Sequence, residues 1–166
     1  MTTSIENAFG SRIMVRGFLL NNQLTDFSFL PQVDGRPVAN RVEPGKRPRS
    51  SMAPTLVFDP SGALRMTLGS PGGPPIILYV AKALVGVLDW GLDIQAAISL
   101  PNAGSLNGPT LIERGSAWEA LAAPLVARGH EVRTFELTSG LQGIERTPDG
   151  WRGGADPRRE GAAAGD

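Results

Sequence analysis

Cysteine is absent from this chain of 166 residues, and histidine occurs once, at His130. Without cysteine the chain has no disulfide framework, no thiolate nucleophile and no thiolate metal site. A single histidine cannot build a histidine-rich metal centre, and any serine–histidine–aspartate triad would have to use it. Any catalysis by this chain therefore depends on hydroxyls, carboxylates, arginine and backbone amides, and we expect neither a metal nor a cofactor.

Net charge and long apolar runs are also missing. The 16 basic and 16 acidic residues cancel, which gives no support for a surface that binds nucleic acid or an anionic membrane. The longest apolar stretch runs from Pro74 to Leu88 and is interrupted by Lys82, so it is shorter than the ~20 residues that a bilayer requires. Residues 1–11 lack the basic segment followed by an apolar run that marks a signal peptide. We expect no nucleic-acid partner and no membrane partner.

Glycine and proline, in contrast, are abundant, with 21 and 14 residues. With 41% apolar and 19% charged residues, the composition is that of a globular protein with many turns. The length suits one domain with a real core and is too short for two ordinary domains. We therefore expect a single domain over residues 1–159, followed by a flexible tail over residues 160–166.

Apolar runs separated by turn signals predict an α+β fold. Strands are expected over residues 12–20, 53–59, 63–69, 109–115 and 131–137, and on both sides of the Pro-Asp-Gly turn at 148–150. The runs over 53–59 and 63–69 form a predicted hairpin, because Pro60-Ser61-Gly62 lies between them. Helices are expected over residues 76–91, 92–100 and 116–130. The first of these helices is nearly all apolar, so it must be covered on most sides and a third layer is expected.

The strongest local signal is the sequence Gly69-Ser70-Pro71-Gly72-Gly73, between a predicted strand and a predicted buried helix. Consecutive glycines tolerate positive φ, so their amides can turn toward one point, and at a helix N-terminus two such amides can stabilise an oxyanion. The alternative is a tight strand-to-helix turn in which the glycines only avoid collisions. The spacing fits neither a P-loop nor a dinucleotide-binding fingerprint.

Two other polar clusters are candidates for ligand binding. Amide, hydroxyl and carboxylate side chains crowd the segment from Asn21 to Asp26, and such a set can bind an ammonium or amide group. The paired hydroxyls of Ser50 and Ser51 precede the next predicted strand. The alternatives are a polar turn for the first cluster and a helix cap or turn hydroxyl for the second.

Taken in order, the chain contains the segments FGSRI, GFLLNNQLTDFS, PGKRPRSSMAPTLVF, LGSPGG, WGLDIQAAISLP and ADPRREG. Together they resemble the small subunit of γ-glutamyltranspeptidases, which are N-terminal-nucleophile hydrolases. The resemblance covers nearly the whole chain and is strongest over residues 1–93, because three separate motifs match in order and spacing. It implies a partial αββα sandwich, in which antiparallel sheets lie between helix layers.

The resemblance also implies an activity. Members of this family are made as one precursor that cleaves itself and frees the α-amine of a threonine. That threonine attacks the carbonyl of a γ-glutamyl amide such as glutathione and forms an acyl-enzyme, from which water, an amino acid or a peptide accepts the acyl group. The implied protein is a γ-glutamyl acyltransferase and hydrolase that uses no cofactor. Its implied partner is the large subunit of the same precursor.

Residue roles follow from the same resemblance. Gly72 and Gly73 match the glycines whose amides form the oxyanion hole. Ser50 and Ser51 match the serine pair that contacts the α-carboxylate of the glutamyl group. The glycine motif and the paired hydroxyls, singled out above on physical grounds, therefore coincide with the family's site.

Gln23 and Asp26 match the family residues that bind the α-amino group of the substrate, and Asp26 would pair with the ammonium. Ser4 falls where the family has a second threonine that supports the nucleophile. Glu6 falls at the usual asparagine, which also touches the amino and carboxylate region. Both positions depart from the family pattern. A second carboxylate repels an α-carboxylate, so Glu6 implies either a stronger grip on the ammonium or a different substrate.

Aligned on FGS and NNQ, Met1 falls inside the hairpin that follows the catalytic threonine of the family, so neither Thr2 nor Thr3 is assigned as the nucleophile. We expect a threonine-initiated strand and a long domain to be encoded upstream of Met1, and the isolated chain to be inactive. Without that strand a sheet edge and apolar surface are exposed, which favours self-association into a homo-oligomer.

Two alternatives to a γ-glutamyltranspeptidase stay open. One is a paralogue that binds γ-glutamyl or amino-acid ligands without turnover. The other is a related acylase for acyl side chains such as those of cephalosporins, which is compatible with Glu6. The resemblance implies a periplasmic or secreted location, although this chain carries no signal for it.

Overall fold

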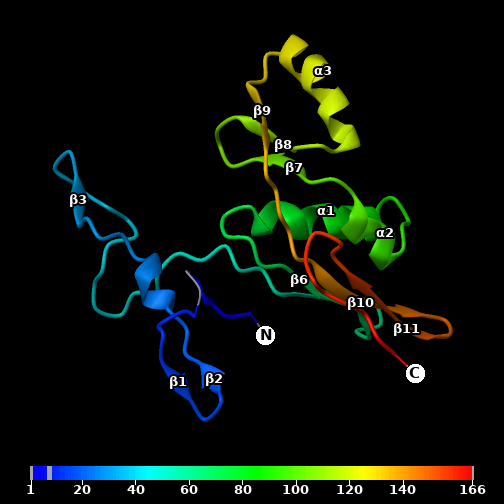
Figure 1. Cartoon of the computed structure of the whole chain (residues 1–166), viewed down its shortest axis with the longest axis horizontal. Coiled ribbons are helices and arrows are strands. Elements are labelled where there is room, and N and C mark those ends of the chain that lie inside the picture. The colour runs from blue at the N-terminus through cyan, green and yellow to red at the C-terminus, as the bar shows by residue number, and fades with distance from the viewer. Residues whose placement is uncertain (1, 7–8, 166) are drawn as a thin grey trace. The chain divides into compact units, whose positions relative to one another are not determined.

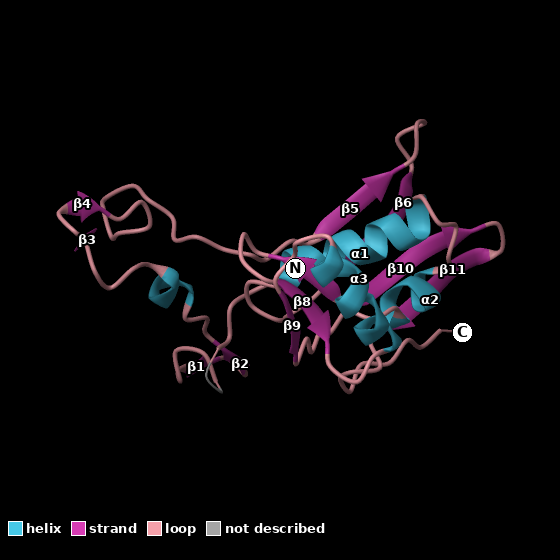
Figure 2. Ribbon diagram, turned by 90° about the horizontal axis from the view of Figure 1, so that it is seen from above, coloured by secondary structure: helices cyan, strands magenta, loops and turns pink. Residues whose placement is uncertain are grey.

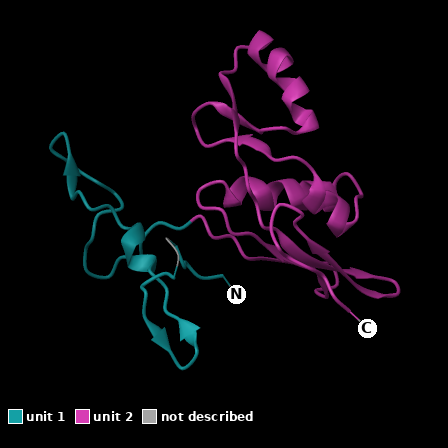
Figure 3. Ribbon diagram, in the orientation of Figure 1, with its two compact units in different colours: residues 1–50 teal, residues 51–166 magenta. Residues whose placement is uncertain are grey.

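The computed structural model describes residues 2–6 and 9–165. The chain divides into two compact units, residues 1–50 and residues 51–166 (Figure 1, Figure 3). The single domain expected over residues 1–159, with its tail over residues 160–166, stays a prediction. Within the described ranges, no helix has the length and apolar character needed to cross a membrane.

Unit 1 (residues 1–50) contains two short antiparallel hairpins and a 3-10 helix. Its elements are β1 (Met14–Val15), β2 (Phe18–Leu19), η1 (Gln23–Asp26), β3 (Gln32–Val33) and β4 (Arg36–Pro37). The single strand predicted over residues 12–20 is wrong, because the chain reverses between β1 and β2. Arg16 and Gly17 at this turn have φ values of +48° and +86°, and a two-residue hairpin turn of type I′ requires positive φ at both positions.

The main sheet of unit 2 (residues 51–166) has four antiparallel strands in the order β11-β10-β6-β5. The strands are β5 (Thr55–Phe58), β6 (Leu64–Gly69), β10 (Gln142–Thr147) and β11 (Gly150–Ala155). The hairpin predicted over residues 53–69 is confirmed, and so are the strands on both sides of the turn at 148–150. The turn between β5 and β6 is stabilised by the Asp59 carboxylate, which accepts hydrogen bonds from the N–H groups of Ser61 and Ala63 at 2.9 and 3.0 Å.

Helices α1 (Ile76–Leu88) and α2 (Ile94–Ser99) cover one face of this sheet (Figure 2). Met66 and Leu68, alternate residues of β6, point to that face and are buried. The core cluster is completed by Ile76, Tyr79, Val80, Ala83, Val87, Ile94, Ala97, Ile98, Leu137 and Leu141. The two helices come close at Gly86, where an added Cβ would lie 2.9 Å from the Cβ of Ala97. The first two predicted helices are therefore confirmed.

A second sheet follows in the order β7-β8-β9. Its strands are β7 (Ala103–Ser105), β8 (Thr110–Glu113) and β9 (Val132–Phe135). The helix predicted over residues 116–130 is shorter and begins as a 3-10 helix, η2 (Ala117–Leu121), before it continues as α3 (Ala122–Ala127). This helical segment links β8 to β9, which pair in parallel, whereas β7 and β8 are antiparallel. The predicted α+β class with antiparallel sheets is confirmed, and β8–β9 is its parallel exception.

A lysine is buried between α1 and the end of α2. The ammonium group of Lys82 donates to the carbonyl oxygens of Ile98 and Leu100 at 3.0 and 2.6 Å, and the residue is 9% exposed. Burial, and to a smaller extent the positive charge of Arg158, lower the pKa of Lys82 to about 8, although the carboxylates of Asp156 and Glu113 act in the opposite direction. The lysine therefore stabilises the helix end through its hydrogen bonds while its charge is costly.

This cost predicts a pH dependence of stability. Between pH 8 and 10 the unfolded chain binds more protons at Lys82 than the folded chain, so the free energy of unfolding should rise with pH, by about 1 kcal/mol per pH unit. Chemical denaturation of the chain at pH 7.5 and pH 9.5 measures this rise. The rise should be absent in Lys82→Met and present in Lys46→Met, which removes the only other lysine. An equal rise in both variants would contradict the assignment.

Candidate functional site

The polar turn of unit 1 joins three of the predicted site residues. Gln23 accepts a hydrogen bond at its Oε1 from the Ser4 hydroxyl, at 2.8 Å. Its Nε2 donates to Oδ2 of Asp26 at 2.7 Å. Gln23 and Asp26 lie at the two ends of η1, and Ser4 is buried. The amide of Gln23 thus orients the Asp26 carboxylate, which is the arrangement that an ammonium-binding acid needs.

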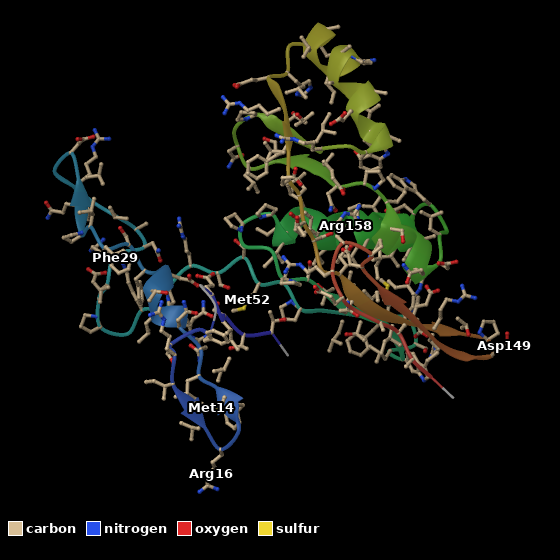
Figure 4. The ribbon with its side chains drawn as sticks, in the orientation of Figure 1. Met14, Arg16, Phe29, Met52, Asp149 and Arg158 are labelled. Atoms are coloured by element: carbon tan, nitrogen blue, oxygen red, sulfur yellow. The ribbon has the colours of Figure 1, made fainter. Side chains whose placement is uncertain are left out.

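Glu6 lies beside this turn. Its backbone N–H donates to Oδ1 of Asn22 at 3.0 Å, and the N–H of Asn22 donates to the carbonyl oxygen of Ser4. The Glu6 side chain is exposed and lines an open pocket of about 640 Å³. The other lining residues, all in unit 1, are Gly10, Ser11, Arg12, Asn21, Asn22, Gln23, Leu24, Thr25 and Phe29, the last labelled in Figure 4. The pocket combines amide, hydroxyl and charged groups, as a polar ligand requires.

The two predicted carboxylate-binding serines lie at the division between the units. Ser50 ends unit 1 and is exposed, whereas Ser51 begins unit 2 and is half-buried. Unit 1 therefore holds the residues predicted for the α-amino end of the substrate together with Ser50. Unit 2 holds Ser51 and the two glycines. That these two sets form one pocket stays a prediction.

The glycine loop of unit 2 connects β6 to α1. Gly72 has a φ of +133° and Gly73 a φ of +66°, so both lie where a side chain is disfavoured. An added Cβ at Gly72 would lie 2.7 Å from Cε2 of Tyr79, whereas the space around Gly73 is open. Among the residues that the structure describes, neither backbone N–H of the pair has a hydrogen-bond partner. Two amides next to the N-terminus of α1 are thus available to an anion.

A buried charge cluster lies behind this loop and was missed by the sequence analysis. The carboxylate of Asp156 is fully buried and accepts from the hydroxyl of Ser139 at 2.5 Å and from the N–H of Leu141 at 3.0 Å. Burial alone would raise the pKa of Asp156, but hydrogen bonds from Ser139, Arg158 and Leu141 outweigh burial and hold it below its ordinary value. The sequence motif ADPRREG, which contains Asp156, is the signal from which this cluster could have been predicted.

Arg158 extends the cluster to the second sheet (Figure 4). Its guanidinium donates to both carboxylate oxygens of Glu113 at 2.6 and 2.9 Å, in the two-pronged geometry typical of arginine, and to Asp156 at 3.0 Å. A third contact reaches the carbonyl oxygen of Leu100 at 3.0 Å. The cluster therefore ties the chain after β11 to β8 and to the end of α2.

No group of three or more histidine, aspartate and glutamate side chains in the described part of the chain could hold a metal ion. His130 is exposed, three residues beyond the end of α3. The groups that the predicted site residues offer are hydroxyls, an oriented carboxylate at Asp26 and the backbone amides of Gly72 and Gly73.

Comparisons with known proteins agree on one family. The model of the family described as gamma-glutamyltranspeptidase matches residues 1–166. The glutathione hydrolase proenzyme of Bacillus subtilis (strain 168) is 35% identical over 169 residues, covering 99% of this chain and 28% of the relative. The Acylase ACY 1 proenzyme of Pseudomonas sp. (strain SE83) is 32% identical and covers 93% of this chain and 27% of its own length. This chain thus spans less than a third of either relative.

Solved structures show the same likeness. The gamma-glutamyltranspeptidase of Pseudomonas nitroreducens complexed with L-DON is 27% identical and superposes with a TM-score of 0.80. The match covers 100% of this chain and 92% of the matched chain of that enzyme. The likeness therefore extends over both units of this chain.

The glycine loop makes a prediction about stability. Gly72→Ala should lower the free energy of unfolding by about 2–3 kcal/mol, because a methyl group there meets both an unfavourable φ and the Tyr79 ring. Gly73→Ala meets only the unfavourable φ and should cost about 1 kcal/mol. Chemical denaturation of the two variants against the parent chain measures the difference. Equal costs would contradict the contact between Gly72 and Tyr79.

Proposed function

The chain belongs to the gamma-glutamyltranspeptidase family, and from this premise we propose that it forms part of an enzyme that cleaves γ-glutamyl amides such as glutathione. In this proposal the chain supplies the oxyanion hole and the wall that binds the glutamyl group. The nucleophilic threonine and the large subunit belong to the complete enzyme. The single observation that carries the proposal is the pair of unpartnered amides at Gly72 and Gly73.

The amides act when the threonine hydroxyl adds to the γ-carbonyl carbon. The carbonyl oxygen then becomes negatively charged, and in this proposal the two N–H groups face its position before the reaction, so they stabilise it without reorganising. The hydroxyl proton passes to the threonine α-amine and then to the leaving amine as the C–N bond breaks. Water adds to the resulting ester and releases glutamate, or an amino acid or peptide adds and forms a new γ-glutamyl amide. One donor of this kind is worth about 100- to 1000-fold in rate.

The polar turn of unit 1 is assigned to the amino-acid head of the substrate. Asp26 is assigned to pair with the α-ammonium. The hydrogen bond from Gln23 to Oδ2 of Asp26 supports this role, because it orients the carboxylate. The Ser4 hydroxyl holds Gln23 in turn. Ser50 and Ser51 are assigned to the α-carboxylate. Glu6, exposed in the pocket, adds a negative charge that favours substrates with a cationic group.

An apolar sheet face supports the large subunit as partner. The face of the main sheet opposite α1 and α2 presents Leu56, Phe58, Ile144 and Trp151, each between 46% and 60% exposed. Leu56 and Ile144 lie in one row across the sheet, because each is in register with Thr67 of β6. A face this apolar is typical of one that packs against another sheet. In unit 1, Phe27 is the single buried apolar residue of the described part, so that unit, unlike unit 2, lacks a core of its own.

The acylase alternative is favoured by one comparison, the likeness to Acylase ACY 1. The two activities share the oxyanion hole and differ in the group at the amino end of the acyl chain, where Asp26 and Glu6 are assigned. A periplasmic or secreted location is part of the proposal, and a homo-oligomer stays a prediction.

The activity is tested on the complete enzyme, this chain together with the large subunit, with a γ-glutamyl anilide as substrate. Asp26→Asn should raise KM about 10- to 100-fold, because it removes the charge that pairs with the ammonium. Asp34→Asn, which changes an exposed aspartate in the turn of the β3–β4 hairpin, is the matched control and should leave KM unchanged.

Three other outcomes separate the alternatives. A complete enzyme that neither hydrolyses nor transfers the γ-glutamyl group contradicts the proposal. Hydrolysis of a glutaryl amide, which lacks the α-amino group, in preference to the γ-glutamyl anilide identifies the acylase. Calorimetric binding of glutamate or glutathione without turnover, lost in Asp26→Ala, identifies the binding paralogue. The 166-residue chain alone is expected to show no turnover.

The partner surface makes its own prediction. Leu56→Lys combined with Ile144→Lys should abolish co-purification of this chain with the large subunit, because two charges would be buried in an apolar interface. Val126→Lys is the matched control, since Val126 is an equally exposed apolar residue on α3. Undiminished co-purification of the double variant would show that the large subunit binds elsewhere.

A further inference from the structure

Ser70 contributes the only polar side chain of the Gly69–Gly73 loop, and it is buried, with 5% exposure. Its hydroxyl donates to the carbonyl oxygen of the next residue, Pro71, at 2.7 Å. The Ser70 hydroxyl oxygen also accepts a hydrogen bond from the backbone N–H of Gly140, at 3.1 Å. One hydroxyl therefore links the loop to a segment 70 residues further along the chain, just before β10.

That segment is held firmly from its other side. Ser139 donates its hydroxyl to Asp156, and it receives a hydrogen bond from the side-chain amide of Asn102 at 2.9 Å. The guanidinium of Arg159 donates to the carbonyl oxygens of Thr138 and Ser139 at 3.2 Å each. Asn102, Ser139 and Asp156 are almost fully buried. The segment is therefore a fixed support, and Ser70 is bonded to it.

Close packing removes the remaining freedom of the loop. A Cβ added to Gly140 would lie 2.7 Å from Cγ of Pro71, so the backbone of residue 140 already touches the proline ring. On the next residue, Gly72 touches the Tyr79 ring. The loop is thus held by a hydrogen bond at Ser70 and by contacts on both sides of it.

We propose that Ser70 is a positioning residue whose hydroxyl, bonded to Gly140, sets the direction in which the amides of Gly72 and Gly73 point. This inference rests on the function proposed above for those amides. A glycine pair has many accessible backbone conformations, so the loop needs a constraint outside itself to keep both N–H groups aimed at one point. An oxyanion donor must lie within 2.7–3.1 Å of the charged oxygen, so a small rotation of either amide reduces its effect.

Two measurements on Ser70→Ala test the proposal. In the complete enzyme, kcat for the γ-glutamyl anilide should fall at least tenfold while KM stays within threefold, because the loop touches the reacting carbonyl and not the amino-acid head. In the 166-residue chain, the ¹⁵N–¹H NMR signals of Gly72 and Gly73 should shift or broaden, and the N–H of Gly140 should exchange faster with solvent.

Ser105→Ala is the matched control. The Ser105 hydroxyl also donates to a carbonyl oxygen and accepts a backbone N–H, both of Gly108, but it does so in an exposed turn. It should change neither kcat nor the glycine signals. Ser70→Thr keeps the hydroxyl and should retain kcat to within threefold of the parent enzyme.

Unchanged Gly72 and Gly73 signals in Ser70→Ala would overturn the proposal, as would a kcat equal to that of Ser105→Ala. Equal losses in Ser70→Thr and Ser70→Ala would also overturn it, because the loss would then come from side-chain volume. The NMR arm needs no turnover. If the complete enzyme is inactive on γ-glutamyl amides, the proposed function fails, while the glycine signals still decide whether Ser70 positions the loop.

Discussion

The carboxylate of Asp156 is fully buried and accepts four hydrogen bonds, from the hydroxyl of Ser139, the N–H groups of Leu141 and Arg158, and the guanidinium of Arg158. An ionised carboxylate without such donors is costly in a protein interior. Here the donors are numerous enough that the pKa of Asp156 lies below its ordinary value despite burial. The buried charge is stable only when these donors surround it. Two of them, Ser139 and Leu141, flank Gly140, which is hydrogen-bonded to Ser70 of the glycine loop.

The positive charges near this carboxylate, on Arg158 and Lys82, also have hydrogen-bond acceptors. Arg158 pairs with both Asp156 and Glu113, and together with Lys82 it donates to the carbonyl oxygen of Leu100 beyond the end of α2. Cations are favourable near the carbonyl end of a helix. Removing one member of such a buried set leaves another charge without a partner, which costs more than the set contributes as a whole. The cluster thus makes β8, α2 and the chain after β11 interdependent.

Local patterns in the sequence identified most of the regular structure of unit 2. The Pro-Ser-Gly turn, the apolar run over α1 and the Pro-Asp-Gly turn each act within a few residues, and each is found where predicted. The hairpin at Arg16 and Gly17 was missed because a non-glycine residue with positive φ has no signature in an apolar run. The glycine motif was found from its composition. Its support by Ser70, Gly140 and Asp156 was not, because the hydrogen bonds from Gly140 to Ser70 and from Leu141 to Asp156 join residues 70 and 15 positions apart.

The two units hold their proposed site residues by different means, and this bears on how the proposed enzyme would assemble. In unit 2 the glycine amides are fixed by a buried core and a buried charge cluster within the same unit. In unit 1 the carboxylate of Asp26 is held by side-chain hydrogen bonds from a turn whose unit buries one apolar side chain, Phe27, among its described residues. Hydrogen bonds between partly exposed groups contribute about 1 kcal/mol each, too little to order a 50-residue unit against its conformational entropy. We therefore expect the binding half of the proposed site to depend on further protein packing against it, whereas the proposed oxyanion half is held by contacts within its own unit.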